Sequence, residues 1–128
     1  MLNNRAVIST PDAPEAIGPY SQAIKVGNTV WLSGQIPLVP GSMELVTGSI
    51  DDQARQVFRN LSAVAEAAGG SLNNAVKINI SLTDMGDFAA VNEVMAEFLQ
   101  PPYPARACVQ VAGLPKGVAI EVEAILAV

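Results

Sequence analysis

Apolar and polar residues alternate along residues 75–83, and a period of two predicts a β-strand whose two faces meet different surroundings. The apolar positions of this segment are Val76, Ile78, Ile80 and Leu82, and the polar ones are Lys77, Asn79 and Ser81. Shorter segments with strand-like patterns are residues 6–9, 23–26, 29–33, 106–111 and 118–123. Gly27-Asn28, between two of them, is typical of a hairpin turn.

One segment after residue 48 carries apolar residues at helical spacing. We expect this helix to begin at Ser49, with Asp52 three residues on in a variant of the capping box, and to end at Gly69-Gly70. Its apolar stripe is formed by Ala54, Val57, Phe58, Leu61, Val64, Ala65 and Ala68. The charged residues off this stripe, which we expect to face solvent, are Arg55, Arg59 and Glu66.

A second helix is predicted after the strand of residues 75–83. Asp84 or Asp87 lies near its first turn, where a negative charge suits the helix dipole, and Gln100-Pro101-Pro102 ends it. Its inner stripe is formed by Phe88, Val91, Met95 and Phe98. The predicted order of elements is therefore β-β-β-α-β-α-β-β.

This order predicts an α+β fold in which both helices pack on one face of a single sheet, as one domain over residues 1–128. The other sheet face then has nothing in the chain to cover it. Only 15% of the residues are charged, against about 25% in an average globular protein. Both observations favour a homo-oligomer that forms through the sheet.

The charge pattern narrows the possible partners. The formal net charge is -5 and no run of Lys or Arg occurs, which disfavours binding to nucleic acid or to anionic membranes. No stretch is long and apolar enough to span a bilayer, and Met1–Arg5 begins no signal peptide. The single cysteine, Cys108, fits a reducing compartment, so we expect a cytoplasmic protein.

Several kinds of chemistry are missing from the sequence. There is no histidine, which removes Ser-His-Asp and Cys-His machinery and every histidine-based metal site. One cysteine makes no thiolate cage, and neither the phosphate loop nor the dinucleotide glycine fingerprint occurs. We therefore expect no metal and no cofactor.

The strongest candidate chemistry lies in the last two predicted strands. Period-two alternation puts Arg106 and Cys108 on one face of the first, and Glu121 and Glu123 on one face of the second. A guanidinium grips a carboxylate with two hydrogen bonds, and a nearby carboxyl group can move protons. A solvated strand face with an incidental ion pair explains the same pattern and is somewhat favoured by the pattern alone.

Four further residues are candidates on weaker grounds. Tyr20 follows the rigid Gly18-Pro19, and either serves a site or packs over the core. Ser33 closes a predicted strand beside Gly34, which either lets a ligand approach the backbone or forms a β-bulge. Asn92 lies beside the stripe of the second helix, where an amide either reaches a ligand or faces solvent.

The chain resembles the reactive intermediate deaminase family, RidA/YjgF. The strongest matching motifs are Pro104-Ala105-Arg106-Ala107-Cys108-Val109, Leu114-Pro115-Lys116 and Ile120-Glu121-Val122-Glu123-Ala124. Supporting motifs are Ile17-Gly18-Pro19-Tyr20-Ser21-Gln22-Ala23, Ser33-Gly34-Gln35-Ile36-Pro37, Gln53-Ala54-Arg55-Gln56 and Val91-Asn92. Two loops, residues 39–44 and 100–103, depart from the usual pattern, which bears on the pocket rim and the substrate range.

The resemblance implies a chorismate-mutase-like fold and a homotrimer whose sheets line a central barrel, with three sites in the clefts between subunits. It also implies that the last strand inserts between earlier strands, whereas the sequence order alone suggests a hairpin of the last two strands.

The resemblance further implies an enzyme that hydrolyses enamines and imines, such as 2-aminoacrylate and 2-iminobutyrate, to 2-oxo acids and ammonium without a cofactor. By this likeness Arg106 binds the substrate carboxylate and Glu121 handles the water and its protons. The implied pocket-lining residues are Tyr20, Ser33, Gly34, Asn92 and Cys108. A non-catalytic trimer that binds 2-oxo acids is the alternative. The acidic charge and the lack of histidine argue against a ribonuclease.

Overall fold

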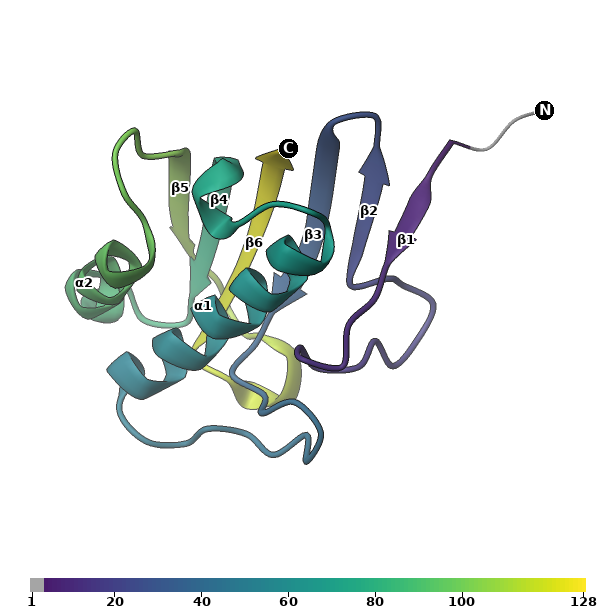
Figure 1. Ribbon diagram of the computed structural model, residues 1–128. Coiled ribbons are helices and arrows are strands. Elements are labelled where there is room, and N and C mark those ends of the chain that lie inside the picture. The colour runs from purple at the N-terminus through teal and green to yellow at the C-terminus, as the bar shows by residue number, and fades with distance from the viewer. Residues whose placement is uncertain (1–3) are drawn as a thin grey trace.

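The computed structural model describes residues 4–128, so Met1, Leu2 and Asn3 of the N-terminal run lie outside the described residues. Six strands form one sheet, and two α-helices lie against it (Figure 1). The strands are β1 (Ala6–Ile8), β2 (Ala23–Val26), β3 (Thr29–Gln35), β4 (Ala75–Leu82), β5 (Ala105–Gln110) and β6 (Ile120–Ala127). The helices are α1 (Ile50–Ala67) and α2 (Phe88–Phe98), with short 3-10 turns η1 (Leu72–Asn74), η2 (Met85–Asp87) and η3 (Pro115–Gly117).

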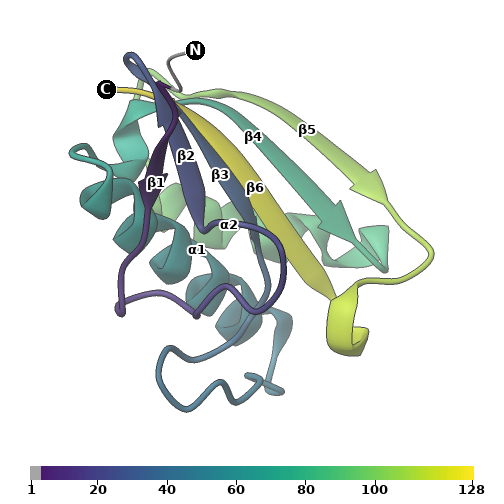
Figure 2. The ribbon, with the colours of Figure 1, turned by 90° about the vertical axis from the view of Figure 1, so that its right-hand side faces the viewer.

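The strands lie in the order β1-β2-β3-β6-β4-β5, with β6 between β3 and β4 (Figure 2). β6 is antiparallel to both neighbours, and β4 and β5 are parallel. The expected insertion of the last strand is confirmed, and the hairpin that sequence order suggested is wrong. β6 begins at Ile120 rather than at residue 118, since Val118 N donates to Pro115 O in the turn before it, at 3.3 Å.

Both helices cover the same face of the sheet, as predicted (Figures 1 and 2). The connections β3-α1-β4 and β4-α2-β5 each join parallel strands, and both advance across the sheet in the same direction. Crossovers between parallel strands are almost always right-handed, so two that advance the same way place their helices on one side. The α+β arrangement is confirmed.

The core lies between the helices and this face of the sheet. The α1 stripe from Ala54 to Ala68 is buried, as are the alternate positions of β4 and β6. The rings of Phe58 on α1 and Phe98 on α2 stack with their centroids 5.6 Å apart. In α2 the predicted stripe packs against the core, but the prediction missed Val94, which is more deeply buried than Phe88 or Met95.

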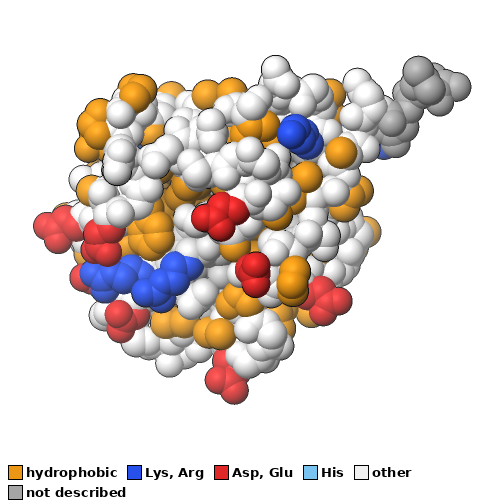
Figure 3. All heavy atoms as spheres, viewed as in Figure 1, with side chains coloured by type: hydrophobic (Ala, Val, Ile, Leu, Met, Phe, Trp, Pro, Cys, Tyr) orange, Lys and Arg blue, Asp and Glu red, His pale blue; other side chains and the backbone are white. Residues whose placement is uncertain are grey.

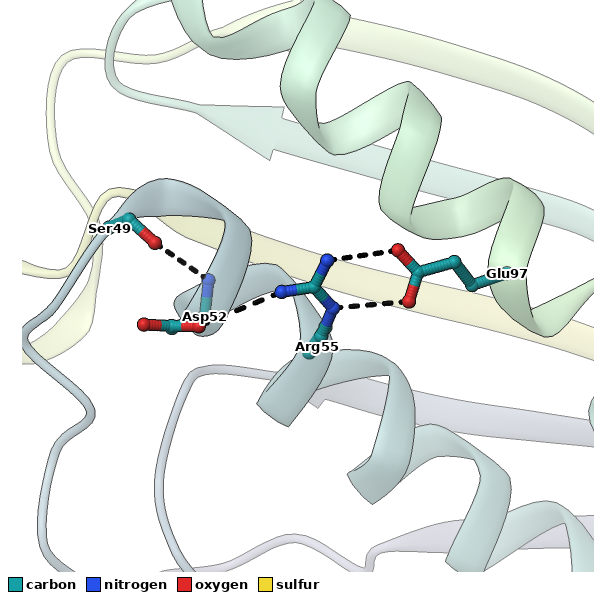
Figure 4. A network of polar contacts seen from close by, with 4 residues as sticks. All are labelled: Ser49, Asp52, Arg55 and Glu97. Carbon is teal, nitrogen blue, oxygen red and sulfur yellow. Dashed lines mark hydrogen bonds and ion pairs between the residues drawn. The ribbon is translucent and has the colours of Figure 1, made fainter.

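Helix α1 is capped as predicted, because the Ser49 side chain accepts a hydrogen bond from Asp52 N at 3.2 Å. Arg59 and Glu66 are exposed, as predicted, and Arg55 is partly exposed but also makes an ion pair that the sequence did not predict. Its guanidinium donates twice to the Glu97 carboxylate on α2, at 3.1 and 3.0 Å, and lies 3.7 Å from Asp52 (Figure 4). The pair joins the two helices, and it holds the pKa of Glu97 below its usual value.

The second face of the sheet carries no helix (Figure 2). Trp31 and Val109, 46% and 52% exposed, are among the large apolar side chains left uncovered in a single chain. On the helix side, a small patch of basic side chains is flanked by acidic ones, and another basic side chain lies apart from it (Figure 3). Neither described helix is long and apolar enough to cross a bilayer.

Candidate active site

Glu121 lies on the sheet face that has no helix. It pairs across the ladder with Ser81 of β4, whereas its neighbours Ile120 and Val122 are buried on the helix face. Glu123 lies two residues further along the same face and accepts a hydrogen bond from Asn79 Nδ2 at 3.2 Å. The predicted pairing of the two carboxylates on one strand face is confirmed.

A bulge in β3 makes room for the Glu121 side chain. Leu32 pairs with Ala124 and Gln35 with Val122, so two residues, Ser33 and Gly34, stand where the regular ladder has one. A Cβ atom added at Gly34 would lie 2.8 Å from Glu121 Cδ, a contact that real Cβ atoms essentially never make. Gly34 is therefore a bulge residue, as one of the two interpretations of the sequence has it, and the space that its missing side chain leaves is used by Glu121. The approach of a ligand to its backbone stays a prediction.

Glu121 and Glu123 line a cleft of about 730 Å³ together with Tyr20 and Ser33. Tyr20 is 54% exposed and lines this cleft. Ser33 Oγ donates to Ser21 O at 2.5 Å, which uses its proton and leaves its oxygen to accept. The structure thus brings together four of the predicted site residues: Tyr20, Ser33, Gly34 and Glu121.

Two buried amides hold the walls of this cleft. Gln22 Nε2 donates to Pro14 O at 2.8 Å and to Thr10 O at 3.0 Å, while its oxygen accepts from Thr10 N. On the other side, Asn60 of α1 donates to Leu38 O at 2.9 Å. Neither Gln22 nor Asn60 was predicted from the sequence to have this role. The sequence did contain a sign of the role of Asn60, because a polar amide lies there among the apolar stripe residues of a helix.

The carboxyl group of Glu121 is electrostatically unusual. Partial burial raises its pKa above the ordinary value, and the nearby Glu123 carboxylate raises it further. The ionised form therefore lacks part of the solvation that stabilises an exposed carboxylate. Such a group is a stronger proton acceptor than a solvated glutamate, because the proton is held more tightly once it arrives.

Arg106 lies on the opposite face of the sheet, on the helix side. It pairs across the ladder with Ile78, which is fully buried under the helices. Its guanidinium donates to the side-chain oxygen of Asn92 on α2 and lies 4.9 Å from the centre of the Phe88 ring. Arg106 and Asn92 together line a second cleft of about 440 Å³.

Arg106 and Glu121 therefore do not meet within one chain. Arg106 shares its face with the core residue Ile78, whereas Glu121 shares its face with Ser81. Because side chains alternate across a strand, the whole thickness of the sheet separates the two. One chain holds two half-sites: an acidic one at Glu121 and a cationic one at Arg106.

Cys108 packs against the core beside Arg106, opposite Ile80 in the ladder. Its sulfur lies 3.9 Å from the Met85 sulfur. Burial raises the pKa of the Cys108 thiol, and the nearby Arg106 charge offsets this only in part. A raised thiol pKa means little thiolate at neutral pH, which disfavours a nucleophilic role.

Cys108→Ala is therefore expected to retain much of any turnover at this site, because its packing and its raised pKa favour a structural role for the thiol over nucleophilic attack. Steady-state kinetics on the folded variant measure this. Complete loss of turnover, together with trapping of a thiol adduct on the wild type, would establish a covalent mechanism instead.

Within residues 4–128, no group of three or more Cys, Asp or Glu side chains is arranged to hold a metal ion. The acidic half-site contains two neighbouring carboxylates, Glu121 and Glu123. Carboxylates accept protons and hold polarised water, so the arrangement supports acid-base chemistry on a small molecule.

Comparison with known proteins shows close likeness along nearly the whole chain. The family model described as Endoribonuclease L-PSP matches residues 10–128. A Dermatophagoides farinae protein named 2-iminobutanoate/2-iminopropanoate deaminase is 50% identical over 127 residues, which cover 99% of each chain. The crystal structure of RidA from an Antarctic Psychrobacter bacterium is 58% identical with a TM-score of 0.93, covering 96% of this chain and 99% of that one. The crystal structure of Escherichia coli TdcF with bound serine is 44% identical with a TM-score of 0.91, covering 96% and 98%.

Proposed function

This chain belongs to the Endoribonuclease L-PSP family, the family of the RidA proteins it was found to resemble, and from that membership we propose that it is an imine deaminase. The proposed substrates are 2-iminobutanoate, 2-iminopropanoate and the enamines in equilibrium with them. The products are 2-oxo acids and ammonium. The relatives' names support this substrate class.

The half-buried Glu121 carboxyl group is the observation that carries the proposal. It lies at the edge of a cleft, beside a glycine that permits close approach, and its pKa is raised. The carbon of a protonated imine is already electrophilic, so hydrolysis needs a placed water and a proton acceptor. Water adds to this carbon while Glu121 takes one of its protons, and Glu121 then gives that proton to the nitrogen. As the C–N bond breaks, Glu121 takes the proton of the new hydroxyl group, so that the carbonyl of the 2-oxo acid forms. The departing ammonia takes this proton from Glu121 and leaves as ammonium.

Arg106 is proposed to bind the substrate carboxylate through two parallel hydrogen bonds. Asn92 and Phe88 orient its guanidinium, which supports this role. Since Arg106 and Glu121 lie on opposite faces of one sheet, a complete site needs a second copy of the chain. We propose a homotrimer with a site at each subunit interface, in which Tyr20, Ser33, Gly34 and Cys108 line the pocket. No cofactor takes part in this scheme.

The proposal is tested by measuring ammonia release from freshly generated 2-iminobutanoate in the presence and absence of the protein. We expect release well above the uncatalysed rate, unchanged by chelators. If the folded protein does not raise the rate of ammonia release above the uncatalysed rate, the proposed deaminase activity is rejected.

The two half-sites make a sharp prediction about mixed oligomers. Arg106→Ala and Glu121→Gln proteins, each impaired alone, are expected to regain activity when their subunits are mixed. In a cyclic trimer each mixed assembly holds one intact site, so equal random mixing restores roughly a quarter of wild-type activity. Activity assays on co-expressed subunits measure this.

Analytical ultracentrifugation of the same samples provides the control. A stable monomer at micromolar concentration, or mixed trimers without any regained activity, would contradict a site shared between subunits.

A non-catalytic 2-oxo-acid-binding protein is the second candidate. The serine bound to Escherichia coli TdcF favours it, because serine carries a carboxylate and no imine. Binding of 2-oxobutyrate without any acceleration of imine hydrolysis would identify this function. A ribonuclease, which the family description names, is not proposed, because the net charge of -5 disfavours contact with phosphate backbones. The cytoplasmic location stays a prediction.

A further inference from the structure

The cleft at Glu121 is lined by two residues with an unusual backbone. Among residues 4–128, two non-glycine residues have positive φ, Met43 at 59° and Lys116 at 57°. Both line this cleft. Left-handed backbone is disfavoured for residues with a Cβ atom, and such strain gathers at functional sites. Met43 and Lys116 are therefore candidates for a role at the cleft, and of the two Lys116 is the one that carries a charge.

Lys116 lies in the turn η3, between β5 and β6. Its φ and ψ are 57° and 18°, and Gly117 follows with φ at 70°. Backbone hydrogen bonds from Gly117 N to Leu114 O at 3.1 Å and from Val118 N to Pro115 O hold the turn. Glycine or asparagine fits a left-handed position with less strain than lysine does. Turn geometry therefore does not explain why a lysine stands here.

The charges around the cleft provide a reason. Three carboxylates line it, from Glu15, Glu121 and Glu123. Lys116 is the one cation among the described lining residues, and the protein as a whole carries a net charge of -5. Before its nitrogen is protonated, the imino acid carries a net negative charge from its carboxylate, so the three carboxylates of the cleft repel it and a positive charge on the lining attracts it. In the proposed trimer, Arg106 of a second copy binds the same carboxylate only after the substrate has entered the site.

We propose that Lys116 is a positioning residue that draws the anionic imino acid toward the Glu121 cleft by charge, at the expense of local backbone strain. The inference rests on the proposed deaminase function and adds a residue to its site. Lys116 acts during substrate capture and touches none of the reacting atoms. It therefore contributes to kcat/KM and not to kcat.

The test compares Lys116→Gln with Lys116→Arg and with Arg59→Gln. The first removes the charge, and the second keeps it. Arg59→Gln changes the net charge by the same amount on helix α1, away from both clefts. For each protein, kcat and KM for 2-iminobutanoate are measured at low salt and near 1 M salt, where charges are screened beyond about 3 Å.

We expect Lys116→Gln to lower kcat/KM by about threefold at low salt, the attraction of one charge about 6 Å away in water, with kcat unchanged. The difference should vanish at high salt, and Lys116→Arg and Arg59→Gln should match the wild type. Equal kcat/KM for Lys116→Gln and wild type at low salt, or a loss that persists at high salt, overturns the proposal.

Lys116→Gly separates capture from folding. It relieves the left-handed strain but also gives the unfolded chain more freedom, and the two effects oppose one another, so its melting temperature should stay close to that of the wild type. Its kcat/KM should fall as in Lys116→Gln. Wild-type kcat/KM in Lys116→Gly at low salt would contradict the proposal. If the wild type itself releases no ammonia, the deaminase proposal fails. Calorimetry of 2-oxobutyrate binding to Lys116→Gln at both salt concentrations then decides the role of Lys116.

Discussion

Glu121→Gln is expected to lower turnover of 2-iminobutanoate by about 10²–10⁴-fold, the usual contribution of general acid–base catalysis. The amide keeps the shape of the side chain in the space that Gly34 leaves, but it does not accept a proton from water. Binding of 2-oxobutyrate, the product of this reaction, should remain nearly intact, because its binding needs no proton transfer. Ammonia-release kinetics and calorimetry on the same preparation measure the two quantities.

The matched control is Glu123→Gln, which removes the neighbouring charge and keeps Glu121. Folding raises the pKa of Glu121, so its stabilising contribution is complete below the unfolded pKa and is lost as the pH rises through the folded pKa. At neutral pH, Glu121→Gln should therefore be no less stable than the wild type, and lost turnover cannot be attributed to unfolding. Normal turnover in Glu121→Gln would assign proton handling to Glu123 or Tyr20.

The pH dependence of the wild-type enzyme follows from the same carboxyl group. As a base, Glu121 works only when ionised, so turnover should rise with pH through a pKa above that of an ordinary glutamate. In Glu123→Gln this rise should move to lower pH, because the neighbouring carboxylate no longer opposes ionisation of Glu121.

Arg106→Ala is expected to weaken 2-oxobutyrate binding by roughly ten- to a hundredfold. A hydrogen bond to a charged group is worth about 1.5–3 kcal/mol, and the arginine contacts the carboxylate in both ground and transition states. Arg106→Lys should recover only part of the loss, because an ammonium does not present a planar fork to two oxygens. Calorimetry with 2-oxobutyrate measures both variants.

Arg59→Ala, which removes a guanidinium from α1, is the control for net charge. Arg106 also donates to Asn92 and lies over Phe88, so Arg106→Ala removes a contact between β5 and α2. Thermal unfolding of each variant therefore accompanies the calorimetry. If the folded Arg106→Ala protein binds 2-oxobutyrate with wild-type affinity, the arginine has a structural role and the proposed carboxylate site has no support.

Much of the fold was predictable because local patterns determine it. The alternation along β4, the α1 stripe with its Ser49 cap and the Gly27-Asn28 turn each involve residues close in sequence. The grouping of Arg106 with Cys108 also follows from the alternation of one strand. The spacing of apolar residues, the helix cap and the turn residues were therefore sufficient to place β4, α1 and the β2–β3 hairpin.

The rest depends on contacts between distant segments. Alternation does not tell which face of the common sheet Arg106 or Glu121 occupies, because that depends on strand order and register. The Arg55–Glu97 pair needs the relative placement of two helices, and Asn60 needs a loop that returns to α1. The family resemblance provided the strand order. The pattern of a single strand could not show that Arg106 and Glu121 lie on opposite faces of the sheet. The site roles themselves stay predictions.

The central place of β6 bears on how the chain reaches its native state. Ala124 pairs with Leu32 on one side and with Ile78 on the other, so both inner ladders close long stretches of chain. Before β6 docks, β3 is paired only with β2 and β4 only with β5, so each has one edge without a partner strand. Ordering so much chain before these pairings form makes folding slow, and unpaired apolar edges are prone to aggregation. The strand that carries Glu121 is thus also the one that commits the sheet to its final form.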